Sequence, residues 1–161
     1  MKKAYFAGGC FWCITPTFES INGVESVVAG YSGGKGEPTY EQVKAQMTRH
    51  RETIEITYDE AKTSYEKLLD IFVRSVDPFD GGGQFIDRGR SYTLAVYYND
   101  QSEKSAAEKA ISELEKSSGE SVYISVEPFD LFYPAEEYHQ DYYKKNPEAF
   151  EEEMKKSGRK I

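Results

Sequence analysis

Residues 3–21, KAYFAGGCFWCITPTFESI, join an apolar, strand-like run to a pair of glycines and then to a stretch with helical character. The glycines at 8 and 9 form a turn that interrupts the strand. Pro16 is compatible with the following helix only if it lies in the first turn. The segment therefore predicts a strand that leads directly into a helix, with Cys10 at the junction between them.

The same alternation of strand and helix continues through the first half of the chain. Two further strands are predicted at residues 24–34 and 51–59, and the second alternates apolar and polar residues as a half-buried strand does. The segment between them, 34–50, is expected to be mostly loop with one helical turn. Ser64 can cap a helix whose apolar face consists of Tyr65, Leu68, Leu69 and Phe72.

The second half has the same pattern. Strands are predicted at residues 92–98 and 122–128. The tail from Ala135 onward is expected to form two short polar helices. Between the two strands, residues 100–119 form an amphipathic helix with four residues facing inward: Ala107, Ala110, Ile111 and Leu114. This alternation predicts an α/β fold with a mixed sheet and helices on one or both faces.

Length and composition predict a single domain, residues 1–161, with enough apolar and aromatic residues to bury a core. The net charge of -8 argues against a nucleic-acid partner, because such binding requires a clustered cationic surface. No apolar run is long enough to span a membrane, and the N-terminal apolar stretch is too short for a signal peptide. We therefore expect a cytoplasmic protein, monomeric by default, with neither a nucleic-acid nor a membrane partner.

The two cysteines of the chain, Cys10 and Cys13, lie three residues apart. In a reducing compartment, such a pair is more often catalytic, redox-active or metal-bound than a structural disulfide. A thiol at a helix N-terminus faces unpaired N–H groups and the positive end of the dipole, which favour the thiolate. Cys10 is thus a candidate nucleophile, and Cys13 can close a disulfide with it. A buried, inert pair fits the spacing almost as well.

A metal site at the cysteines would need two more ligands. His50 and His139 are the only histidines, and they lack the paired spacing of a zinc motif, so no metal is expected. Phe11 and Trp12 stand between the cysteines. Both rings fit core packing, and both also fit the wall of an apolar pocket for a small group such as a methyl.

Seven motifs follow one another along the chain: GGCFWC, GYSGG, PTYEQV, HRETIEITYD, YEKLLDIFVRSVDP, DRGRSY and FYPAEEYHQDYY. In content, order and spacing they resemble the A-type peptide methionine sulfoxide reductases. The resemblance extends from about Ala7 to about Tyr143, and the ordered set is far more specific than any one motif. It implies an α/β (α+β) fold, a ferredoxin-like two-layer plait with a mixed β-sheet, flanking helices and long loops around the active site.

The resemblance also implies the roles of four reacting groups. Cys10 would attack the sulfoxide sulfur and take up its oxygen as a sulfenic acid. Glu52, a carboxylic acid kept neutral by burial, would protonate that oxygen. Tyr40 and Tyr92 would donate hydrogen bonds to the same oxygen.

Further positions are implied to support the site. Asp87 would organise the site and its water. Phe11 and Trp12 would form the pocket for the substrate's ε-methyl group, which favours the second of their two possible roles. His139 matches a recurrent family position, and we expect it to give structural support only.

The sequence departs from the family's pattern at several positions. Cys13 stands where a glycine is usual, Thr15 where a glutamate is common, and Lys44 near a frequent recycling cysteine. No cysteine follows Cys13, so it is the only candidate to resolve the sulfenic acid within the chain. In the long loop expected at residues 81–91, GQFID replaces the usual RQGND.

The resemblance predicts a cofactor-free enzyme that reduces methionine S-sulfoxide, free or in proteins, through a Cys10–Cys13 disulfide. Thioredoxin or a similar dithiol would be its reductant. One alternative is a thioredoxin-like thiol–disulfide oxidoreductase, which shares the CxxC motif but leaves the later motifs unexplained. Another is a non-enzymatic module that senses oxidation or binds methionine-rich peptides and would tolerate Cys10→Ser.

Overall fold

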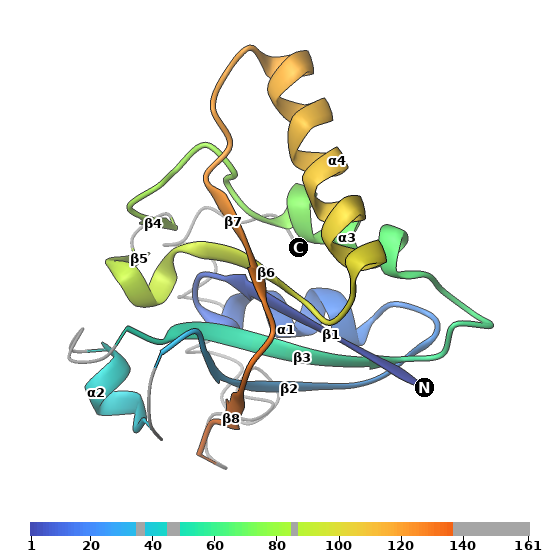
Figure 1. Ribbon diagram of the computed structural model, residues 1–161. Coiled ribbons are helices and arrows are strands. Elements are labelled where there is room, and N and C mark those ends of the chain that lie inside the picture. Colours follow the sequence, from blue (N-terminus) through green and yellow to red (C-terminus); the bar gives the residue numbers. More distant parts are fainter. Residues whose placement is uncertain (35–37, 45–48, 85–86, 137–161) are drawn as a thin grey trace.

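A six-stranded mixed β-sheet forms the centre of the protein (Figure 1). The computed structural model describes residues 1–34, 38–44, 49–84 and 87–136. Neighbouring strands are antiparallel, except for one parallel pair at an edge. From that edge to the other, the strands are β7 (Ile124–Pro128), β6 (Leu94–Tyr98), β1 (Lys2–Gly8), β3 (Arg51–Tyr58), β2 (Val24–Ser32) and β8 (Phe132–Pro134).

The inner part of the sheet has the predicted ferredoxin-like topology. Helix α1 (Phe11–Glu19) connects β1 to β2, and helix α3 (Tyr65–Ser75) lies between β3 and β6 in the chain. Because β3 pairs with both β1 and β2, the strand order is β6-β1-β3-β2. Helix α4 (Gln101–Ser118) then makes the long crossover that a parallel pair requires and brings β7 beside β6. The predicted α/β plait with a mixed sheet is confirmed.

The helices pack against one face of the sheet, where most of the core lies. Phe6 of β1 stacks on Phe72 of α3 with 4.8 Å between ring centroids, and both side chains are fully buried. A smaller apolar cluster occupies the opposite face, where Tyr5 stacks on Phe129 at 3.9 Å. Since side chains alternate along a strand, β1 contributes to both clusters. The same alternation places the consecutive residues Arg51 and Glu52 on opposite faces of β3.

Pro16 is not where the sequence predicted it to be. The helix already begins at Phe11, so Pro16 lies inside α1 rather than in its first turn. There it has no N–H to donate to the carbonyl four residues earlier. The neighbouring Thr15 hydroxyl donates to the Phe11 carbonyl at 2.6 Å, and Ile14 and Phe18 are buried in the core. Tertiary packing therefore maintains a helix that its proline weakens.

The region predicted as a long loop contains regular structure. Strands β4 (Gly83–Gln84) and β5 (Asp87–Arg88) pair as a short hairpin, and a 3₁₀ turn, η1 (Arg90–Tyr92), follows. The Gln84 side chain anchors the hairpin, since its amide donates to the Asp77 carbonyl at 2.8 Å. Two-residue strands show no hydrophobic periodicity, so the sequence pattern could not reveal them.

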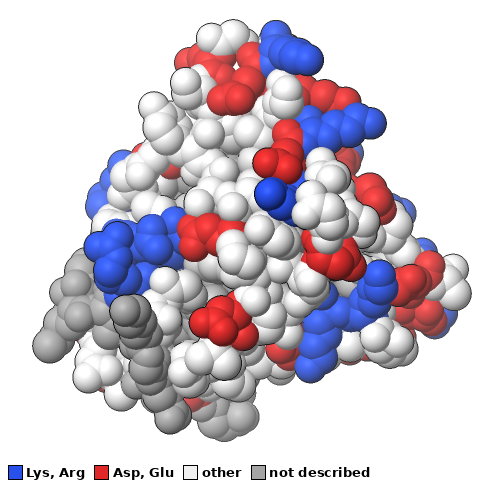
Figure 2. All heavy atoms as spheres, viewed as in Figure 1, with Lys and Arg blue, Asp and Glu red and all other residues white. Residues whose placement is uncertain are grey.

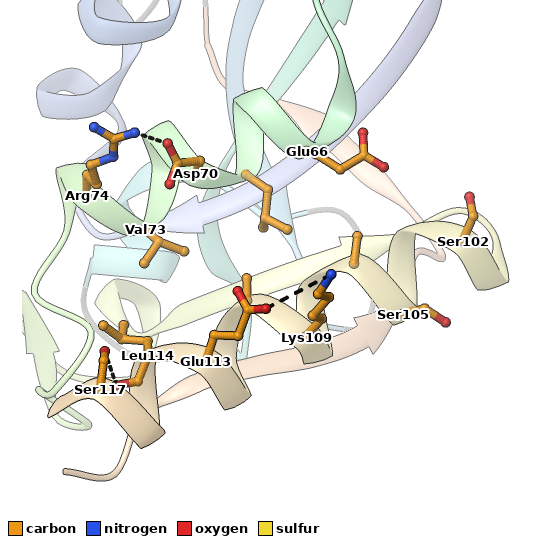
Figure 3. Close-up of a pocket in the computed structure, with 13 residues that line it drawn as sticks. Glu66, Asp70, Val73, Arg74, Ser102, Ser105, Lys109, Glu113, Leu114 and Ser117 are labelled. Atoms are coloured by element: carbon orange, nitrogen blue, oxygen red, sulfur yellow. Dashed lines mark hydrogen bonds and ion pairs between the residues drawn. The ribbon is translucent and has the colours of Figure 1, made fainter. Parts of the chain in front are cut away.

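The helix predicted at residues 100–119 is α4, but its inward face is less buried than expected. Ala107 is fully buried, whereas Ala110, Ile111 and Leu114 are half-buried. Ala110 and Leu114 line a groove of about 800 Å³ between α3 and α4 (Figure 3). None of the predicted site residues lines this groove.

The remaining elements connect the sheet to its surroundings. The single helical turn expected between the second and third strands is α2 (Tyr40–Lys44). β8 was not expected; it covers the outer edge of β2, where a side chain at Gly30 would overlap the Phe132 ring. The polar helices and His139 expected after Ala135 lie outside the described residues, which end at 136. Within those residues, no helix is both long and apolar enough to cross a membrane.

Candidate active site

The site is built around the turn that joins β1 to α1. β1 ends at Gly8, Gly9 adopts φ 87°, and Cys10 is the residue that precedes the helix. The Cys13 N–H donates to the Cys10 carbonyl at 3.0 Å, which closes the first turn. The strand-turn-helix predicted from residues 3–21 is therefore present, with Cys10 at the junction.

The side chains of Cys10 and Cys13 form a hydrogen bond with each other, and both are buried. This hydrogen bond raises the pKa of Cys10, as do burial and the nearby Glu52 and Asp87. The prediction that the helix N-terminus would favour the Cys10 thiolate is therefore wrong for this state of the protein. The reason is that the hydrogen bond to Cys13, burial and the neighbouring acidic groups all favour the protonated thiol.

Glu52 lies on β3 with its side chain beside the start of α1. Its Oε1 accepts the Phe11 N–H at 3.1 Å, while its buried Oε2 has no hydrogen-bond partner among the described residues. Burial is the main reason that the pKa of Glu52 rises to about 8; Asp87 and Cys13 raise it further. The Phe11 N–H opposes this rise because it stabilises the carboxylate. Glu52 is consequently protonated at neutral pH.

The hairpin and the 3₁₀ turn bring Asp87 and Tyr92 to the same place. Asp87 is half-buried on β5 and acts electrostatically on both Cys10 and Glu52. Tyr92 is buried at the end of η1, and burial raises the pKa of its phenol, with smaller contributions from Glu52, Tyr40, Cys10 and Asp87. The phenol therefore remains a hydrogen-bond donor at neutral pH.

Tyr40 reaches the site as the first residue of α2. Its N–H donates to Glu136 Oε2 at 3.2 Å, and the hydroxyl of Tyr31 donates to Glu136 Oε1, also at 3.2 Å. The ring of Phe11 lies 5.8 Å from that of Tyr31 and 6.2 Å from that of Tyr40, measured between centroids. The carboxylate of Glu136, in the segment after β8, thus links Tyr31 of β2 to Tyr40 of α2 beside these rings.

Phe11 and Trp12 are the first two residues of α1. Phe11 is fully buried, so its ring packs against aromatic neighbours rather than presenting an open face. Trp12 is the second residue of α1, but its side chain lies outside what the structure describes. The proposed substrate pocket at these two residues stays a prediction.

Three residues at the site were missed by the sequence reasoning. Tyr31 and Glu136 both lie inside quoted motifs, GYSGG and FYPAEEYHQDYY, but a motif does not reveal which of its side chains meet. Lys44 was considered only as the replacement of a cysteine. Its Nζ lies 5.8 Å from the centroid of the Tyr40 ring, and its charge lowers the pKa of Glu52, against the larger effect of burial.

The assembled groups fit oxygen transfer to sulfur. A thiol, a neutral carboxyl group and a protonated phenol lie within electrostatic range of one another, and a second free thiol is hydrogen-bonded to the first. An oxygen bound to sulfur could take a proton from the carboxyl group here while the thiol approaches the sulfur that carries the oxygen. Among the residues described, no group of three or more His, Cys, Asp and Glu is arranged to hold a metal ion.

Sequence comparisons identify one family. The family model described as peptide methionine sulfoxide reductase matches residues 2–160. Peptide methionine sulfoxide reductase MsrA 2 of Staphylococcus aureus (strain MRSA252) is 47% identical over 165 residues, which covers 99% of this chain and 93% of the relative. Peptide methionine sulfoxide reductase MsrA of Halalkalibacterium halodurans is 47% identical over 162 residues, covering 99% and 92%.

Solved structures give the same result. Reduced Mxr1 from Saccharomyces cerevisiae has a TM-score of 0.85 at 28% identity, covering 91% of this chain and 86% of Mxr1. Methionine sulfoxide reductase A of Corynebacterium diphtheriae has a TM-score of 0.82 at 26% identity, covering 91% and 75%. Mxr1 in complex with Trx2 has a TM-score of 0.61 at 20% identity, covering 88% and 84%, which supports the fold alone.

Proposed function

The chain belongs to the peptide methionine sulfoxide reductase family, and we propose that it carries out this thiol-dependent reduction with Cys10 as its nucleophile. The single observation that carries the assignment of residues is the pairing of Glu52 with the start of α1. This acid is neutral, has a free buried oxygen, and lies beside the residue that follows Cys10.

In the first step, the sulfur of Cys10 attacks the sulfur of the sulfoxide. The S–O bond of the substrate breaks, methionine leaves, and the oxygen ends on Cys10 as a sulfenic acid. The thiol is oxidised and the sulfoxide is reduced, both by two electrons. The thiol proton balances the hydroxyl of the product, so no net proton is consumed.

Glu52 would act as the proton relay in this step. Oxide is a poor leaving group, so the sulfoxide oxygen must be protonated as attack proceeds. Glu52 and Cys10 both hold a proton at neutral pH, because burial raises the pKa of each. Glu52 can therefore give its proton to the oxygen and be reprotonated at the expense of the thiol.

Tyr40, Tyr92 and Asp87 would orient the oxygen. A phenol with a raised pKa, such as that of Tyr92, donates a hydrogen bond without competing to lose its proton. Asp87 raises the pKa of Glu52 and of Cys10, which helps to keep both protonated before substrate arrives. Phe11 and Trp12 would receive the ε-methyl group, as the family resemblance implies.

Cys13 would complete the chemical cycle. Its thiol is already hydrogen-bonded to Cys10. Attack of Cys13 on the sulfenic sulfur forms a disulfide and releases water, and a dithiol then returns both cysteines to thiols. Thioredoxin or a similar protein fits this role; the existence of an Mxr1 complex with Trx2 supports the proposal.

Other features of the proposal rest on the sequence and the family. We expect a preference for the S epimer, action on free or protein-bound methionine sulfoxide, and no cofactor. We also expect one domain over residues 1–161, a monomer and a cytoplasmic location. The alternative function is that of a thiol–disulfide oxidoreductase, which would reduce disulfides and not sulfoxides.

A single turnover without reductant tests the proposal. The reduced protein is mixed with methionine S-sulfoxide, and released methionine and remaining thiols are counted. We expect about one methionine per chain and the loss of both thiols. One methionine with one surviving thiol would retain Cys10 and remove Cys13 from the scheme. No methionine, with intact reduction of a model disulfide, would favour the oxidoreductase.

A further inference from the structure

A cavity with two arginines in its lining lies on the opposite side of β3 from Glu52. It has a volume of about 340 Å³ and is lined by residues of β3, η1 and β7. Side chains alternate along a strand, so consecutive residues Arg51 and Glu52 point to opposite faces. We call the part of this cavity formed by Arg51 and Arg90 the arginine pocket.

Arg51 is held firmly in the pocket. It is only 4% exposed, and its Nε donates to Thr93 Oγ1 at 2.8 Å. Its Nη1 donates to the Tyr97 hydroxyl at 3.0 Å and to Glu127 Oε2 at 2.7 Å. These bonds use Nε and Nη1, while Nη2 has no partner among the described residues. The guanidinium is therefore fixed with donor capacity to spare.

The nearby carboxylate is largely committed to this arrangement. Glu127 Oε2 accepts from Arg51 and also from the Ser125 hydroxyl, the latter at 2.7 Å. The Thr93 hydroxyl is occupied as well, because it donates to the Arg90 carbonyl at 2.7 Å. The hydroxyls around Arg51 and the Oε2 atom of Glu127 are therefore satisfied by one another.

Arg90 adds a second guanidinium, and the charge of Glu127 acts on it as well. Its Nε donates to the Arg49 carbonyl at 3.2 Å, and within the described ranges its two terminal nitrogens have no partner. Burial lowers the pKa of Arg90, and so does the charge of Arg51. Figure 2 shows basic side chains gathered next to acidic ones on the left of the molecule, the side on which Figure 1 labels β5. The two guanidinium charges at this cavity thus exceed the single carboxylate charge of Glu127 beside them.

We propose that the arginine pocket binds a tetrahedral oxyanion, either inorganic phosphate or a phosphomonoester. The unused donors belong to two guanidinium groups carried by different elements, β3 and η1, so they can meet oxygens that point in different directions. Guanidinium groups pair strongly with phosphate oxygens. A planar carboxylate offers its two oxygens in one plane and is a poorer match.

The pocket is separate from the reaction site. Its lining residues include none of the groups proposed to touch substrate, and β3 lies between them. Binding at the pocket can therefore be measured on the complete reduced protein without any turnover. The proposal stands or falls independently of the reductase chemistry.

Thermal unfolding measures the interaction. Inorganic phosphate, glycerol phosphate and succinate are titrated separately at constant ionic strength held with sodium chloride. We expect a saturable rise in Tm with phosphate. An equal rise with glycerol phosphate would identify the monoester, and a rise with phosphate alone would identify the free ion. A larger effect of succinate, or no effect beyond that of chloride, would overturn the proposal.

Two variants locate the effect. Arg90→Gln should weaken the apparent phosphate affinity by about tenfold or more, because it removes charged hydrogen bonds, and Arg90→Lys should fall between it and the parent protein. Arg74→Gln is the matched control, since Arg74 is exposed on α3 and paired with Asp70 (Figure 3). Equal phosphate affinity in Arg90→Gln and Arg74→Gln would contradict the assignment of the site.

Discussion

The Glu52 carboxyl group accepts the N–H of Phe11 at 3.1 Å, so the proposed acid is hydrogen-bonded to the first residue of the helix that Cys10 precedes. The N–H is one of the donors that every helix leaves unpaired at its start. This hydrogen bond holds the Glu52 carboxyl group beside the start of α1, next to Cys10, through a backbone donor and not through an ion pair. The same burial that isolates the carboxyl keeps it protonated.

Replacing this acid should remove the chemical step. Glu52→Gln keeps an oxygen to accept the Phe11 N–H but cannot deliver a proton. We expect its single-turnover rate to fall by roughly 10²–10⁴-fold. In the parent protein, the rate should decline as the pH rises through about 8, where Glu52 ionises. Glu55→Gln, on the other face of the same strand, is the control and should retain the parent's rate and pH profile.

The stability of the protein should report on the same carboxyl group. In the unfolded chain, Glu52 loses its proton near the ordinary glutamate pKa of 4.5, but in the folded chain its pKa is about 8. Between these values the unfolded state binds fewer protons, so this group makes the free energy of unfolding fall as the pH rises. Glu52→Gln should therefore become progressively more stable than the parent from pH 5 to pH 8. Urea denaturation at several pH values measures this difference; a constant difference would contradict the assignment.

Cys13→Ser should separate the two halves of the cycle. The first half needs only Cys10, so one methionine per chain should still be released. Without a second thiol, the sulfenic acid should persist as a mass increase of one oxygen, and turnover with thioredoxin should fall sharply. Cys10→Ser is the matched control and should release no methionine. Full turnover by Cys13→Ser would show that an external thiol reacts directly with the sulfenic acid.

Glu136 should position Tyr40 rather than take part in the chemistry. Glu136→Ala removes the acceptor for the Tyr40 N–H and the Tyr31 hydroxyl. We expect kcat/KM to fall by roughly tenfold, as the loss of a charged hydrogen bond implies. The pH profile set by Glu52 should remain, and Glu136→Gln should recover part of the loss. Glu41→Ala, at the exposed neighbour of Tyr40, should behave like the parent; an altered pH profile in Glu136→Ala would indicate a direct role in proton transfer.

Gly83 should be required for the hairpin that carries Asp87. Its φ of 146° is unfavourable for other residues, and a Cβ there would lie 2.2 Å from the Asp87 carbonyl oxygen. Gly83→Ala should therefore lower both stability and activity. Gly119→Ala is a useful comparison, because Gly119 ends α4 with φ 73° and open space around it. It should cost about 1 kcal/mol of stability and leave activity intact. Equal activity losses in the two variants would contradict a specific role for the hairpin.

Much of this fold was predictable because its longer elements have clear periodicity. β3 alternates in burial over much of its length, and Ser64 caps α3 by accepting the Lys67 N–H, as its sequence indicates. Pro16 was misplaced because a local rule about proline was overridden by packing around Phe18. The β4–β5 hairpin is fixed by Gln84 and Gly83, which leave no repeating pattern.

The site and its electrostatics could be predicted from the sequence only in part. Motif resemblance predicted Cys10 and Glu52 as site residues, and the ionisation of Cys10 depends in part on groups that other elements bring near it. Asp87 and Glu52 are distant from Cys10 in sequence, yet both raise the pKa of its thiol. The helix N-terminus next to Cys10 is a local feature, and by itself it predicted a lowered pKa for the thiol. The hydrogen bond to Cys13 contributes most to the raised pKa and burial follows, and the spacing of the two cysteines does not reveal either effect.

The raised pKa of Cys10 also bears on how the protein survives the conditions in which it is needed. Peroxides and alkylating agents react with thiolates, and a buried thiol that keeps its proton is a poor target for them. An enzyme that repairs oxidised methionine works where such oxidants are abundant. If Cys10 is the nucleophile, as we propose, keeping its thiol protonated would protect the catalytic cysteine from these reagents between turnovers.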